Sequence, residues 1–407
     1  MNDPPQDATE LFKNIRQSTS VELRLGASSL PGLTKDEMAR YGRHLVLHEI
    51  GIEGQRRLKA SSVLVVGVGG LGTPAATYLV AAGVGRVGLV DGDVIEKTNL
   101  HRQVLFTESD VGKKKVLVAK SRLLKTNPNV KIEAIPVRLD SSNALELFSR
   151  FDLVVDATDN LPSRYLISDA CVLLGKPDVF ASALGFDGQA SVFYSREGPC
   201  YRCFYPQPPP PETVESCENA GVLGVVPGIM GSVQAVQAIN LLLHNGSPLI
   251  GKLLVFSGID SSFVQIRIKK NPDCPVCGSN PTIKKLIDYE QFCGTRRQSD
   301  DSNLDIDPVE LKESMSHGAK MILLDVREPY EYEICHIRGS KLIPLGELSK
   351  RLHELEKDRE IVVYCHHGNR SATAMNLLRK EGYTNSRNLK GGIDAWRVRV
   401  DPTMRSY

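Results

Sequence analysis

A glycine-rich loop between an apolar run and a run of small residues constrains this chain more than any other feature. The loop reads GVGGLG, a G-x-G-x-x-G pattern with glycines at Gly67, Gly69, Gly70 and Gly72. It follows the β-branched run 62–66 and precedes the small-residue stretch 73–82, so the sequence predicts a strand, a tight turn and a helix. Backbone N–H groups in such a turn can approach a phosphate at the helix N-terminus. The loop by itself indicates a nucleotide-binding unit, and it is also typical of a dinucleotide oxidoreductase.

Strands and helices alternate on both sides of this loop. Thr34 and Glu37 form a capping box, which predicts a helix running through Arg43 to Leu47. Further strands are expected at 86–90, 130–137, 151–155, 179–183, 253–257 and 263–268, and helices at 113–124, 163–174 and 227–243. Apolar strands separated by helices predict a mainly parallel sheet covered on both faces. The expected fold class is α/β, a Rossmann-like doubly wound sheet followed by a smaller α/β domain.

The 407 residues favour two or three domains. We expect an N-terminal extension at 1–33, a nucleotide-binding domain at 34–278, a polar linker at 279–303 and a second domain at 304–407. The net charge of +2 argues against a dedicated nucleic-acid binder, so no direct nucleic-acid partner is expected. The chain shows no signal-peptide pattern and no apolar run of the roughly 18 residues that a membrane span needs. No membrane association and a cytoplasmic location are therefore expected.

Charged and amide side chains follow the predicted strands of the first domain. Asp91 ends the second strand, where an acidic group meets ribose hydroxyls. The segment Thr98-Asn99-Leu100-His101-Arg102 comes next, and Lys115 begins a helix. Asp159-Asn160 ends the fourth strand, where open α/β sheets place their ligands. Two cations that can neutralise phosphate charge and an aspartate that can hold Mg²⁺ favour ATP over nicotinamide.

Several segments in fixed order resemble the ubiquitin-activating superfamily, in its branch that activates molybdopterin-synthase and thiamine-type sulfur carriers. They read RYGRHLVL, VLVVGVGGLGTPAATYLVAAGVGRVGLVDGDVIEKTNLHRQ, VGKKKV, VVDATDN and TVESCENAGVLG, and the resemblance covers about residues 36–278. It implies that the glycine loop, Asp91, the segment 98–102, Lys115 and Asp159-Asn160 bind ATP. A carboxylate at the carrier's C-terminus then attacks the α-phosphate. Catalysis is mainly positioning and electrostatic stabilisation.

The same resemblance implies two further roles. Relatives form homodimers in which an arginine at the position of Arg43 reaches the partner's ATP site. The next residue, His44, departs from the Arg-Gln that the family often carries there. Cys217 stands where larger relatives carry a thioester cysteine, and it can equally be a loop cysteine without an essential role.

Two Cys-x-x-Cys pairs lie about 70 residues apart, Cys200 with Cys203 and Cys274 with Cys277. Four thiolates in two such pairs make a closed tetrahedral zinc site, which is structural because no coordination position is left open. A redox pair or unpaired cysteines are the alternatives. The matching family also carries zinc cysteines at these positions.

The second domain carries a cysteine directly after an apolar strand. Residues 360–364 run into Cys365-His-His-Gly-Asn-Arg370, and a helix follows. Loop N–H groups, the helix N-terminus and the Arg370 guanidinium are expected to point at the sulfur and to favour a thiolate or persulfide anion. The segment 304–400 resembles single-domain rhodaneses, including GGIDAW at 391–396. An inactive rhodanese usually lacks this cysteine. Cys-dependent phosphatases have a related loop but usually add a general-acid aspartate, for which there is no clear candidate.

The sequence thus predicts an adenylyltransferase and sulfurtransferase that uses ATP, Mg²⁺ and structural Zn²⁺. Its partner is a ubiquitin-like sulfur-carrier protein ending in Gly-Gly, which leaves as a thiocarboxylate. A persulfide donor such as a cysteine desulfurase is expected to load Cys365. A catalytically silent scaffold that docks sulfur carriers and a simple Rossmann oxidoreductase are the alternatives. The pathway stays open between molybdenum cofactor synthesis, tRNA thiolation, thiamine synthesis and cysteine synthesis.

Overall fold

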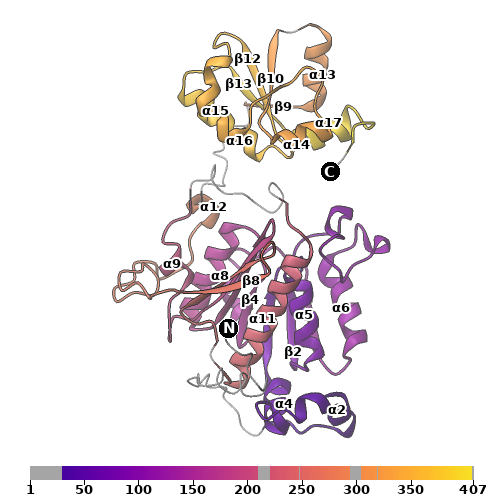
Figure 1. Ribbon diagram of the computed structural model, residues 1–407, viewed down its shortest axis with the longest axis vertical. Helices are drawn as coiled ribbons and strands as arrows, with labels where there is room; N and C mark the ends of the chain where they lie inside the picture. Colours follow the sequence, from indigo (N-terminus) through magenta and orange to yellow (C-terminus); the bar gives the residue numbers. More distant parts are fainter. Residues whose placement is uncertain (1–29, 210–220, 247, 294–303, 319, 406–407) are drawn as a thin grey trace, which may run out of the picture. The chain divides into compact units, whose positions relative to one another are not determined.

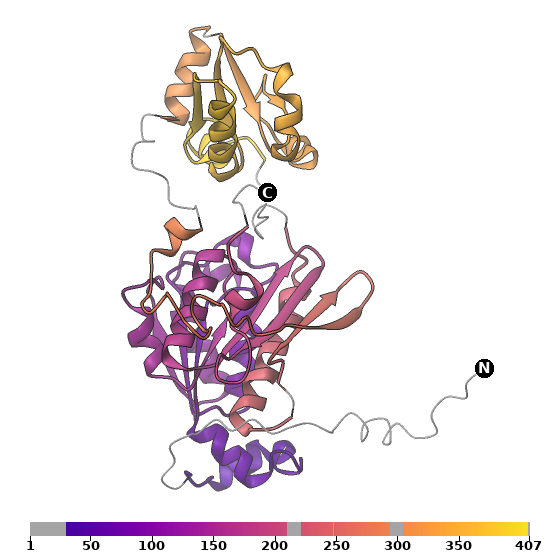
Figure 2. The same ribbon diagram turned by 90° about the vertical axis from the view of Figure 1, so that its left-hand side faces the viewer.

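The computed structural model describes residues 30–209, 221–246, 248–293, 304–318 and 320–405. The chain divides into two compact units, and Figures 1 and 2 show the sheet and helices of each. The first unit contains the described residues up to Pro208 and those from 221 to Phe292, and the second contains those from Cys293 onward, together with Pro209.

The first unit is built on one eight-stranded sheet with the order β3-β2-β1-β4-β5-β6-β7-β8. The strands β1 to β5 pair in parallel with one another, whereas the pairs β5–β6, β6–β7 and β7–β8 are antiparallel. Their bounds are β1 Ser62–Val66, β2 Arg86–Val90, β3 Lys131–Ile135, β4 Leu153–Asp156, β5 Asp178–Leu184, β6 Asp187–Phe193, β7 Lys252–Ser257 and β8 Ser262–Arg267.

Helices cover this sheet on both faces, as the α/β pattern predicts. Figure 1 shows α11 and α5 side by side over the strands, and their side chains share one apolar core with β1, β2 and α6. The helix α8 packs on β4 and β5 and also contacts α7, α9 and α12. The bounds are α2 Lys35–Arg40, α3 Gly42–Leu45, α4 Gly51–Ala60, α5 Gly72–Ala81, α6 Lys115–Thr126, α7 Ala144–Ser149, α8 Leu161–Leu174, α9 Tyr201–Phe204, α11 Val225–Leu243 and α12 Tyr289–Phe292.

The helix α11 is the one described helix that is long and apolar enough to cross a membrane by length and composition. Half of its apolar window is buried inside the unit, against α5 and β5. A buried core helix passes the same length and composition test, and these contacts account for its apolar character.

The first unit differs from the sequence-based predictions at β6 and at Tyr41. The strand β6 was not predicted, because its sequence DGQASVF lacks a β-branched run and begins with a turn-forming Asp-Gly. The helix predicted from the capping box to Leu47 is broken at Tyr41, which lies between α2 and α3. Tyr41 is buried, and its hydroxyl accepts a hydrogen bond from Asn127 Nδ2 at 2.8 Å. Tertiary packing at this one side chain overrides the local helical pattern.

The first half of the segment predicted as a linker belongs to the first unit. The sequence assigns 279–303 to a polar linker, but 279–292 lies within this unit and contains α12. Its polar composition misled the prediction, because three of its side chains are inserted into the unit. These side chains are Ile283, Tyr289 and Phe292.

The second unit contains a five-stranded parallel sheet with the order β11-β10-β12-β13-β9. Its strands are β9 Asp305–Ile306, β10 Met321–Asp325, β11 Lys341–Leu342, β12 Glu360–Tyr364 and β13 Ser386–Leu389. Its helices are α13 Pro308–Ser316, α14 Pro329–Ile334, α15 Leu345–Arg351, α16 Asn369–Lys380 and α17 Gly392–Arg399. Apolar clusters lie on both faces of β12, which confirms the smaller α/β domain that the sequence predicts.

Candidate active sites and metal centre

The glycine loop lies at the carboxyl ends of the central strands of the first unit. The loop joins β1 to α5, and β1 pairs with β2 on one side and β4 on the other. The strand order therefore reverses between β1 and β4. Open α/β sheets bind ligands in the crevice at such a reversal.

Close backbone packing requires glycine at two positions of this loop. Gly67 has a φ of +88°, and a Cβ there would lie 2.7 Å from the carbonyl oxygen of Ala157. A Cβ on Gly72 would lie 1.9 Å from the carbonyl oxygen of Gly67. A third glycine, Gly70, lies between Arg102 and Pro227, whose nearest atoms would be 3.4 Å and 3.1 Å from a Cβ. The loop is thus packed against β4, the 98–103 segment and the start of α11.

The Asp91 carboxylate already binds backbone amides. Its Oδ2 accepts a hydrogen bond from the N–H of Val68 at 2.8 Å, and its Oδ1 accepts one from the N–H of Asp93 at 2.8 Å. Each carboxylate oxygen can accept a second hydrogen bond. Asp91 therefore braces the glycine loop and keeps acceptor capacity for the ribose hydroxyls that the sequence assigns to it.

The two predicted phosphate-binding cations sit in different surroundings. Arg102 is half-buried, and its Nη1 donates to the carbonyl of Thr98 at 3.0 Å and to His101 Nε2 at 2.8 Å. Burial, followed by the charge of Arg102, lowers the pKa of His101, so a neutral imidazole accepts this hydrogen bond. Lys115 Nζ lies 3.0 Å from Asp93 Oδ2, and its side chain is 9% exposed while that of Asp93 is 73% exposed. A partner so exposed contributes little to an ion pair, so a phosphate can replace it.

Asp159 and Asn160 occupy the turn after β4, beside the glycine loop. Asp159 is exposed, and Asn160 caps α8 by accepting a hydrogen bond from the N–H of Ser163 at 3.0 Å. The turn is held by the buried Asp156, whose Oδ1 accepts from the N–H of Thr158 at 3.0 Å and from its hydroxyl at 2.6 Å. Burial raises the pKa of Asp156, and its hydrogen bonds from Thr158 oppose that shift. This support for the Asp159 turn was not predicted from the sequence.

A cavity of about 360 Å³ lies at the opposite edge of the sheet, where the strands begin. Its lining is strongly basic and includes Lys59, Arg86, Lys131, Arg150 and Lys176. Two of these cations donate to carbonyls at the end of α7, Lys176 to Ser149 at 2.9 Å and Arg86 to Arg150. Cations beside a helix C-terminus stabilise it, and Arg86, Lys131 and Arg150 also pair with Glu133, so most of this charge is compensated within the protein. The candidate nucleotide site is therefore the glycine loop and not this cavity.

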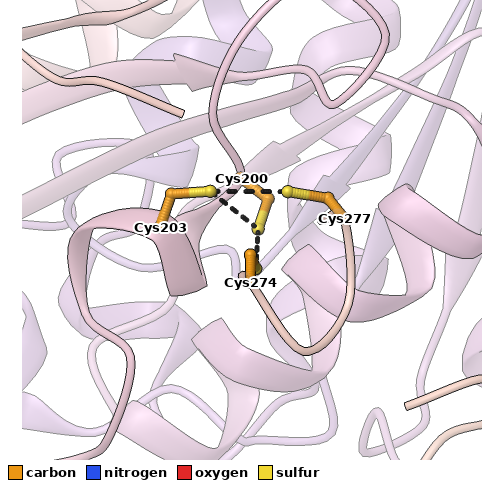
Figure 3. A group of neighbouring side chains, drawn as sticks. All are labelled: Cys200, Cys203, Cys274 and Cys277. Atoms are coloured by element: carbon orange, nitrogen blue, oxygen red, sulfur yellow. Dashed lines mark hydrogen bonds between the residues drawn. The ribbon is translucent and has the colours of Figure 1, made fainter. Parts of the chain in front are cut away.

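The four paired cysteines come together as the sequence predicts (Figure 3). Their sulfur atoms all lie within 4.8 Å of one another, with Cys200 Sγ 3.5 Å from Cys274 Sγ and Cys203 Sγ 3.4 Å from Cys277 Sγ. Zinc–sulfur bonds of about 2.3 Å in a tetrahedron place the sulfurs about 3.8 Å apart. The four thiols are therefore compatible with a zinc ion held by these residues alone.

In the second unit, Cys365 follows β12 and precedes the N-terminus of α16, as predicted. It is 2% exposed, and its Sγ accepts a hydrogen bond from the N–H of Gly368 at 3.1 Å. The hydroxyl of Ser371 lies 3.4 Å from the same sulfur and donates at 2.6 Å to Asn388 Oδ1. Asn388 is held in turn by Asp305, which accepts from its Nδ2 at 2.7 Å. The sequence analysis missed Ser371, whose only signal is its place one turn into the helix.

Arg370 has an acidic partner that the sequence did not predict. The sequence predicts a guanidinium aimed at the sulfur, but its Nη1 and Nη2 donate to the two carboxylate oxygens of Glu331 at 2.6 and 2.7 Å. Both side chains are largely buried, so the charge of Arg370 is compensated by a partner 39 residues away in the sequence. Arg370 thus ties the loop to α14.

The GGIDAW segment, residues 391–396, forms backbone hydrogen bonds with the cysteine loop. The N–H of Ile393 donates to the carbonyl of Cys365 at 2.9 Å, and the N–H of Asp394 donates to that of His366 at 3.1 Å. Gly392 has a φ of +64°, and a Cβ there would lie 2.5 Å from the carbonyl oxygen of Cys365. Burial, followed by the charge of His367, lowers the pKa of His366 to about 4, so the loop carries a neutral imidazole beside Cys365.

Two predicted site residues lie apart from these centres. Cys217 lies outside the described residues. Arg43 is exposed on α3, which packs against α4. The helix α4 in turn contacts the C-terminal end of α11, where Gly54 lies beside Leu243. The glycine loop contacts the start of α11. The 19 residues of α11 span about 28 Å, so the helices around Arg43 and the glycine loop lie toward opposite ends of α11.

Two parts of the chain match known protein families. Residues 41–276 match the ThiF family model, which is more than half of the chain. The chain belongs to the ThiF family. Residues 307–399 of this ThiF-family chain match the rhodanese-like domain.

Relatives of similar length are named for both kinds of domain. The chain is 43% identical over 386 residues to a probable adenylyltransferase/sulfurtransferase MoeZ of Mycobacterium tuberculosis, covering 92% of this chain and 96% of the relative. It is 42% identical over 419 residues to the adenylyltransferase and sulfurtransferase MOCS3 of Anopheles gambiae, covering 98% and 95%. Among solved structures, Escherichia coli MccB with AMPCPP and MccA has a TM-score of 0.52 at 26% identity, covering 59% of this chain and 74% of that one.

Two glycines of α11 test the packing of the nucleotide loop. A Cβ on Gly231 would lie 2.2 Å from the carbonyl oxygen of Leu71, whereas a Cβ on Gly228 meets nothing within 4 Å. We expect Gly231→Ala to destabilise the ThiF domain by about 1–3 kcal/mol and to weaken ATP binding, because a loop carbonyl must move. Urea unfolding and nucleotide titration measure both effects.

Gly228→Ala is the matched control in the same helix. It should leave ATP binding unchanged and should not destabilise the domain, because alanine is the better helix former. Equal behaviour of the two variants would contradict the packing argument.

The metal centre makes a second prediction. Freshly purified protein should contain one zinc ion per chain, and Cys274→Ser should lose it together with stability on the order of several kcal/mol, since structural zinc contributes folding free energy. Elemental analysis and thermal unfolding measure the two losses. Cys335→Ser, in a half-buried cysteine outside the cluster, should keep the zinc. Wild-type protein without zinc would contradict the assignment.

Proposed function

We propose that this protein adenylylates the C-terminal glycine of a ubiquitin-like sulfur-carrier protein and then transfers sulfur to it from a Cys365 persulfide, giving the carrier thiocarboxylate. The observation that carries the proposal is the combination of sites: a glycine loop at the reversal of a ThiF-type sheet and a cradled cysteine in a rhodanese-like domain. Relatives that match more than nine-tenths of the chain are named for both activities. Retention of both sites does not favour a catalytically silent scaffold.

The first half-reaction needs ATP and Mg²⁺ at the carboxyl edge of the sheet. The glycine loop and Asp91 receive the nucleotide, Arg102 and Lys115 compensate the phosphate charge, and Asp159 holds Mg²⁺. The related structure of MccB with AMPCPP supports a nucleotide in this fold. The carrier carboxylate attacks the α-phosphate, and pyrophosphate leaves. No general base is required because the nucleophile is already an anion at neutral pH.

The second half-reaction uses the cysteine of the rhodanese-like domain. A persulfide donor, such as a cysteine desulfurase, loads Cys365. The terminal sulfur attacks the carbonyl carbon of the acyl-adenylate, AMP leaves, and an acyl disulfide forms. A thiolate then attacks the Cys365 sulfur, which breaks the sulfur–sulfur bond and releases the thiocarboxylate. We assign this thiolate to Cys217, and the resulting Cys217–Cys365 disulfide is returned to two thiols by an external reductant.

We also propose that the enzyme is a homodimer in which Arg43 completes the partner's nucleotide site. Arg43 is exposed, and the helices around it lie toward the opposite end of α11 from the glycine loop of its own chain. Large apolar side chains are also exposed near Arg43, on α2, on α4 and in the segment between α3 and α4. These are Met38, Val46, Leu47 and Ile52. A second copy that covers them would also receive Arg43.

Arg43→Ala should lower ATP–pyrophosphate exchange on the order of 10³-fold, by analogy with other arginine fingers. Arg40→Ala, an exposed arginine on the neighbouring helix, is the control and should stay near wild type. Mixing Arg43→Ala with Lys115→Ala should restore part of the activity, because a mixed dimer contains one complete site. A monomer with full exchange activity in light scattering would contradict the proposal.

Cys365→Ala should separate the two half-reactions. We expect pyrophosphate exchange near the wild-type rate, because no thiol takes part in adenylylation, and complete loss of thiosulfate:cyanide sulfurtransfer and of carrier thiocarboxylate. Cys335→Ala in the same domain is the control. Mass spectrometry of the carrier measures the product.

The same assay tests Cys217. A folded Cys217→Ala variant should keep exchange and accumulate carrier joined to Cys365. Normal thiocarboxylate from the Cys365→Ala protein, supplied only with a persulfide donor, would overturn the mechanism.

A further inference from the structure

A chain of polar side chains leads from Cys365 to the outer strand of the rhodanese-like sheet. The Ser371 hydroxyl oxygen lies 3.4 Å from Cys365 Sγ and 2.6 Å from Asn388 Oδ1, and Asn388 Nδ2 donates to Asp305 Oδ1 at 2.7 Å. Cys365, Ser371 and Asn388 are each at most 2% exposed. Asp305 and Asn388 are register neighbours on β9 and β13. The chain therefore runs through the interior of the unit and ends at an acidic group.

The acidic end of this chain decides the direction of every hydrogen bond in it. A carboxylate only accepts hydrogen bonds, so Asn388 turns its NH2 group toward Asp305 and its carbonyl oxygen toward Ser371. An amide carbonyl oxygen also only accepts, so the single proton of the Ser371 hydroxyl points at Asn388. The hydroxyl oxygen therefore faces Cys365 with its lone pairs.

Cys365 has one neighbour that favours its anion and one that favours its thiol. The N–H of Gly368 donates to Sγ at 3.1 Å, which stabilises negative charge on the sulfur. Ser371, held in the direction that Asn388 sets, only accepts a hydrogen bond from the thiol S–H. If the hydroxyl turned to donate to a thiolate, the buried carbonyl oxygen of Asn388 would lose this donor, which is costly in the interior.

Charged side chains near the cysteine loop are paired with one another. Three of them act on His366, the residue after Cys365, and each has a partner of opposite charge. The pairs are Glu331 with Arg370, Arg327 with Asp325 and Asp394 with Arg397. The two members of each pair offset much of one another's field at the loop. The direction of the hydrogen bond between Cys365 and Ser371 therefore has a larger share in setting the state of the sulfur.

We propose that Asp305 is a positioning residue for Cys365: through Asn388 it holds the Ser371 hydroxyl as an acceptor, and this keeps the unloaded cysteine a thiol. The thiolate, not the thiol, is the reactive nucleophile. A persulfide carries its charge on the outer sulfur, one S–S bond of about 2.05 Å beyond Sγ, and its inner sulfur has neither a charge nor a proton. Ser371 therefore restrains the unloaded cysteine and not the loaded one.

This restraint protects the acyl-adenylate, a consequence that rests on the proposed function. An unloaded Cys365 thiolate would attack the carbonyl carbon, form a carbon–sulfur bond and expel AMP, which leaves the carrier as a thioester without transferred sulfur. Loading avoids this product. Cys365 attacks the outer sulfur of the donor persulfide, the donor leaves as a thiol that takes the Cys365 proton, and the new persulfide attacks the acyl-adenylate through its outer sulfur.

The test measures alkylation of Cys365 in the full-length enzyme after cyanide has removed any persulfide. In Asp305→Ala, the Asn388 amide can turn its NH2 group toward Ser371, whose hydroxyl then donates to the sulfur. We expect iodoacetamide to modify Cys365 about tenfold faster near neutral pH, a ratio that corresponds to about 1.4 kcal/mol, the size of one net hydrogen bond. In alkali, where the thiol is ionised in every variant, the rates should be equal. Peptide mass spectrometry identifies the modified cysteine.

Three further variants separate this effect from a loss of stability. Asp305→Asn is the conservative variant and should give a smaller increase, because its amide oxygen can still accept from Asn388. Ser371→Ala removes the hydroxyl, so adding Asp305→Ala in that background should change nothing further. Asp307→Ala is the matched control, because it removes the N-cap of α13 and leaves the Asn388 contact in place. Its alkylation rate should be that of the wild type.

Unchanged alkylation in both Asp305 variants overturns the proposal, and so does an increase that persists in alkali or in the Ser371→Ala background. A second measurement incubates each variant with ATP and carrier in the absence of a sulfur donor. Asp305→Ala should accumulate about tenfold more hydroxylamine-sensitive carrier on Cys365 at the wild-type rate of pyrophosphate exchange. Faster alkylation without added thioester overturns the protective role. Failure of the wild-type enzyme to exchange pyrophosphate would instead overturn the proposed function, and the alkylation result would still stand.

Discussion

The edge of the ThiF-type sheet that carries the glycine loop depends on close contacts between backbone atoms. Where this loop, β4 and α11 come together, no side chain separates their backbones. Side chains on Gly72, Gly224 and Gly231 would lie 1.9 to 2.2 Å from backbone carbonyl oxygens. Protein interiors are close-packed, so none of these carbonyls can move without shifting the elements that carry it. The loop, the 98–103 segment and α11 therefore form one assembly that fixes the path of the loop.

The rhodanese-like unit holds Cys365 in a similar backbone arrangement. A strand ends, a tight loop follows, and a helix N-terminus faces the reactive atom, here Cys365 Sγ. Gly392 lets the start of α17 approach the carbonyls of Cys365 and His366, which its N–H groups then bind. In both units the backbone provides the scaffold, and some of the charged side chains around it form ion pairs within the protein, Lys115 with Asp93 and Arg370 with Glu331.

These ion pairs differ in burial, and burial separates exchangeable pairs from structural ones. Lys115 is paired with a well-exposed carboxylate of Asp93, so a phosphate can take over its ammonium group at little cost. Arg370–Glu331 and Arg202–Asp169 are buried and bidentate, and breaking them would leave an uncompensated charge in the interior. The first pair can be exchanged for another anion, and the other two hold the loop of Cys365 and the segment that leads away from the Cys-x-x-Cys knuckle.

The sequence by itself determined the features that are local or set by fixed chemistry. Runs of apolar residues located β1, β2, β4 and β12, because continuous apolar strands are buried wherever they lie in an α/β fold. The glycine pattern located the loop. The two Cys-x-x-Cys pairs predicted that Cys200 lies beside Cys274, because four thiols complete one tetrahedral site. Only the tertiary structure decided β6, the break at Tyr41 and the partners Asp93, Glu331 and Ser371. It also decided that 279–292 is packed in the first unit, in part through a hydrogen bond from Tyr289 to Asp169 across 120 residues of chain. Such contacts join residues far apart in the sequence, and no local pattern records which buried group will need a partner.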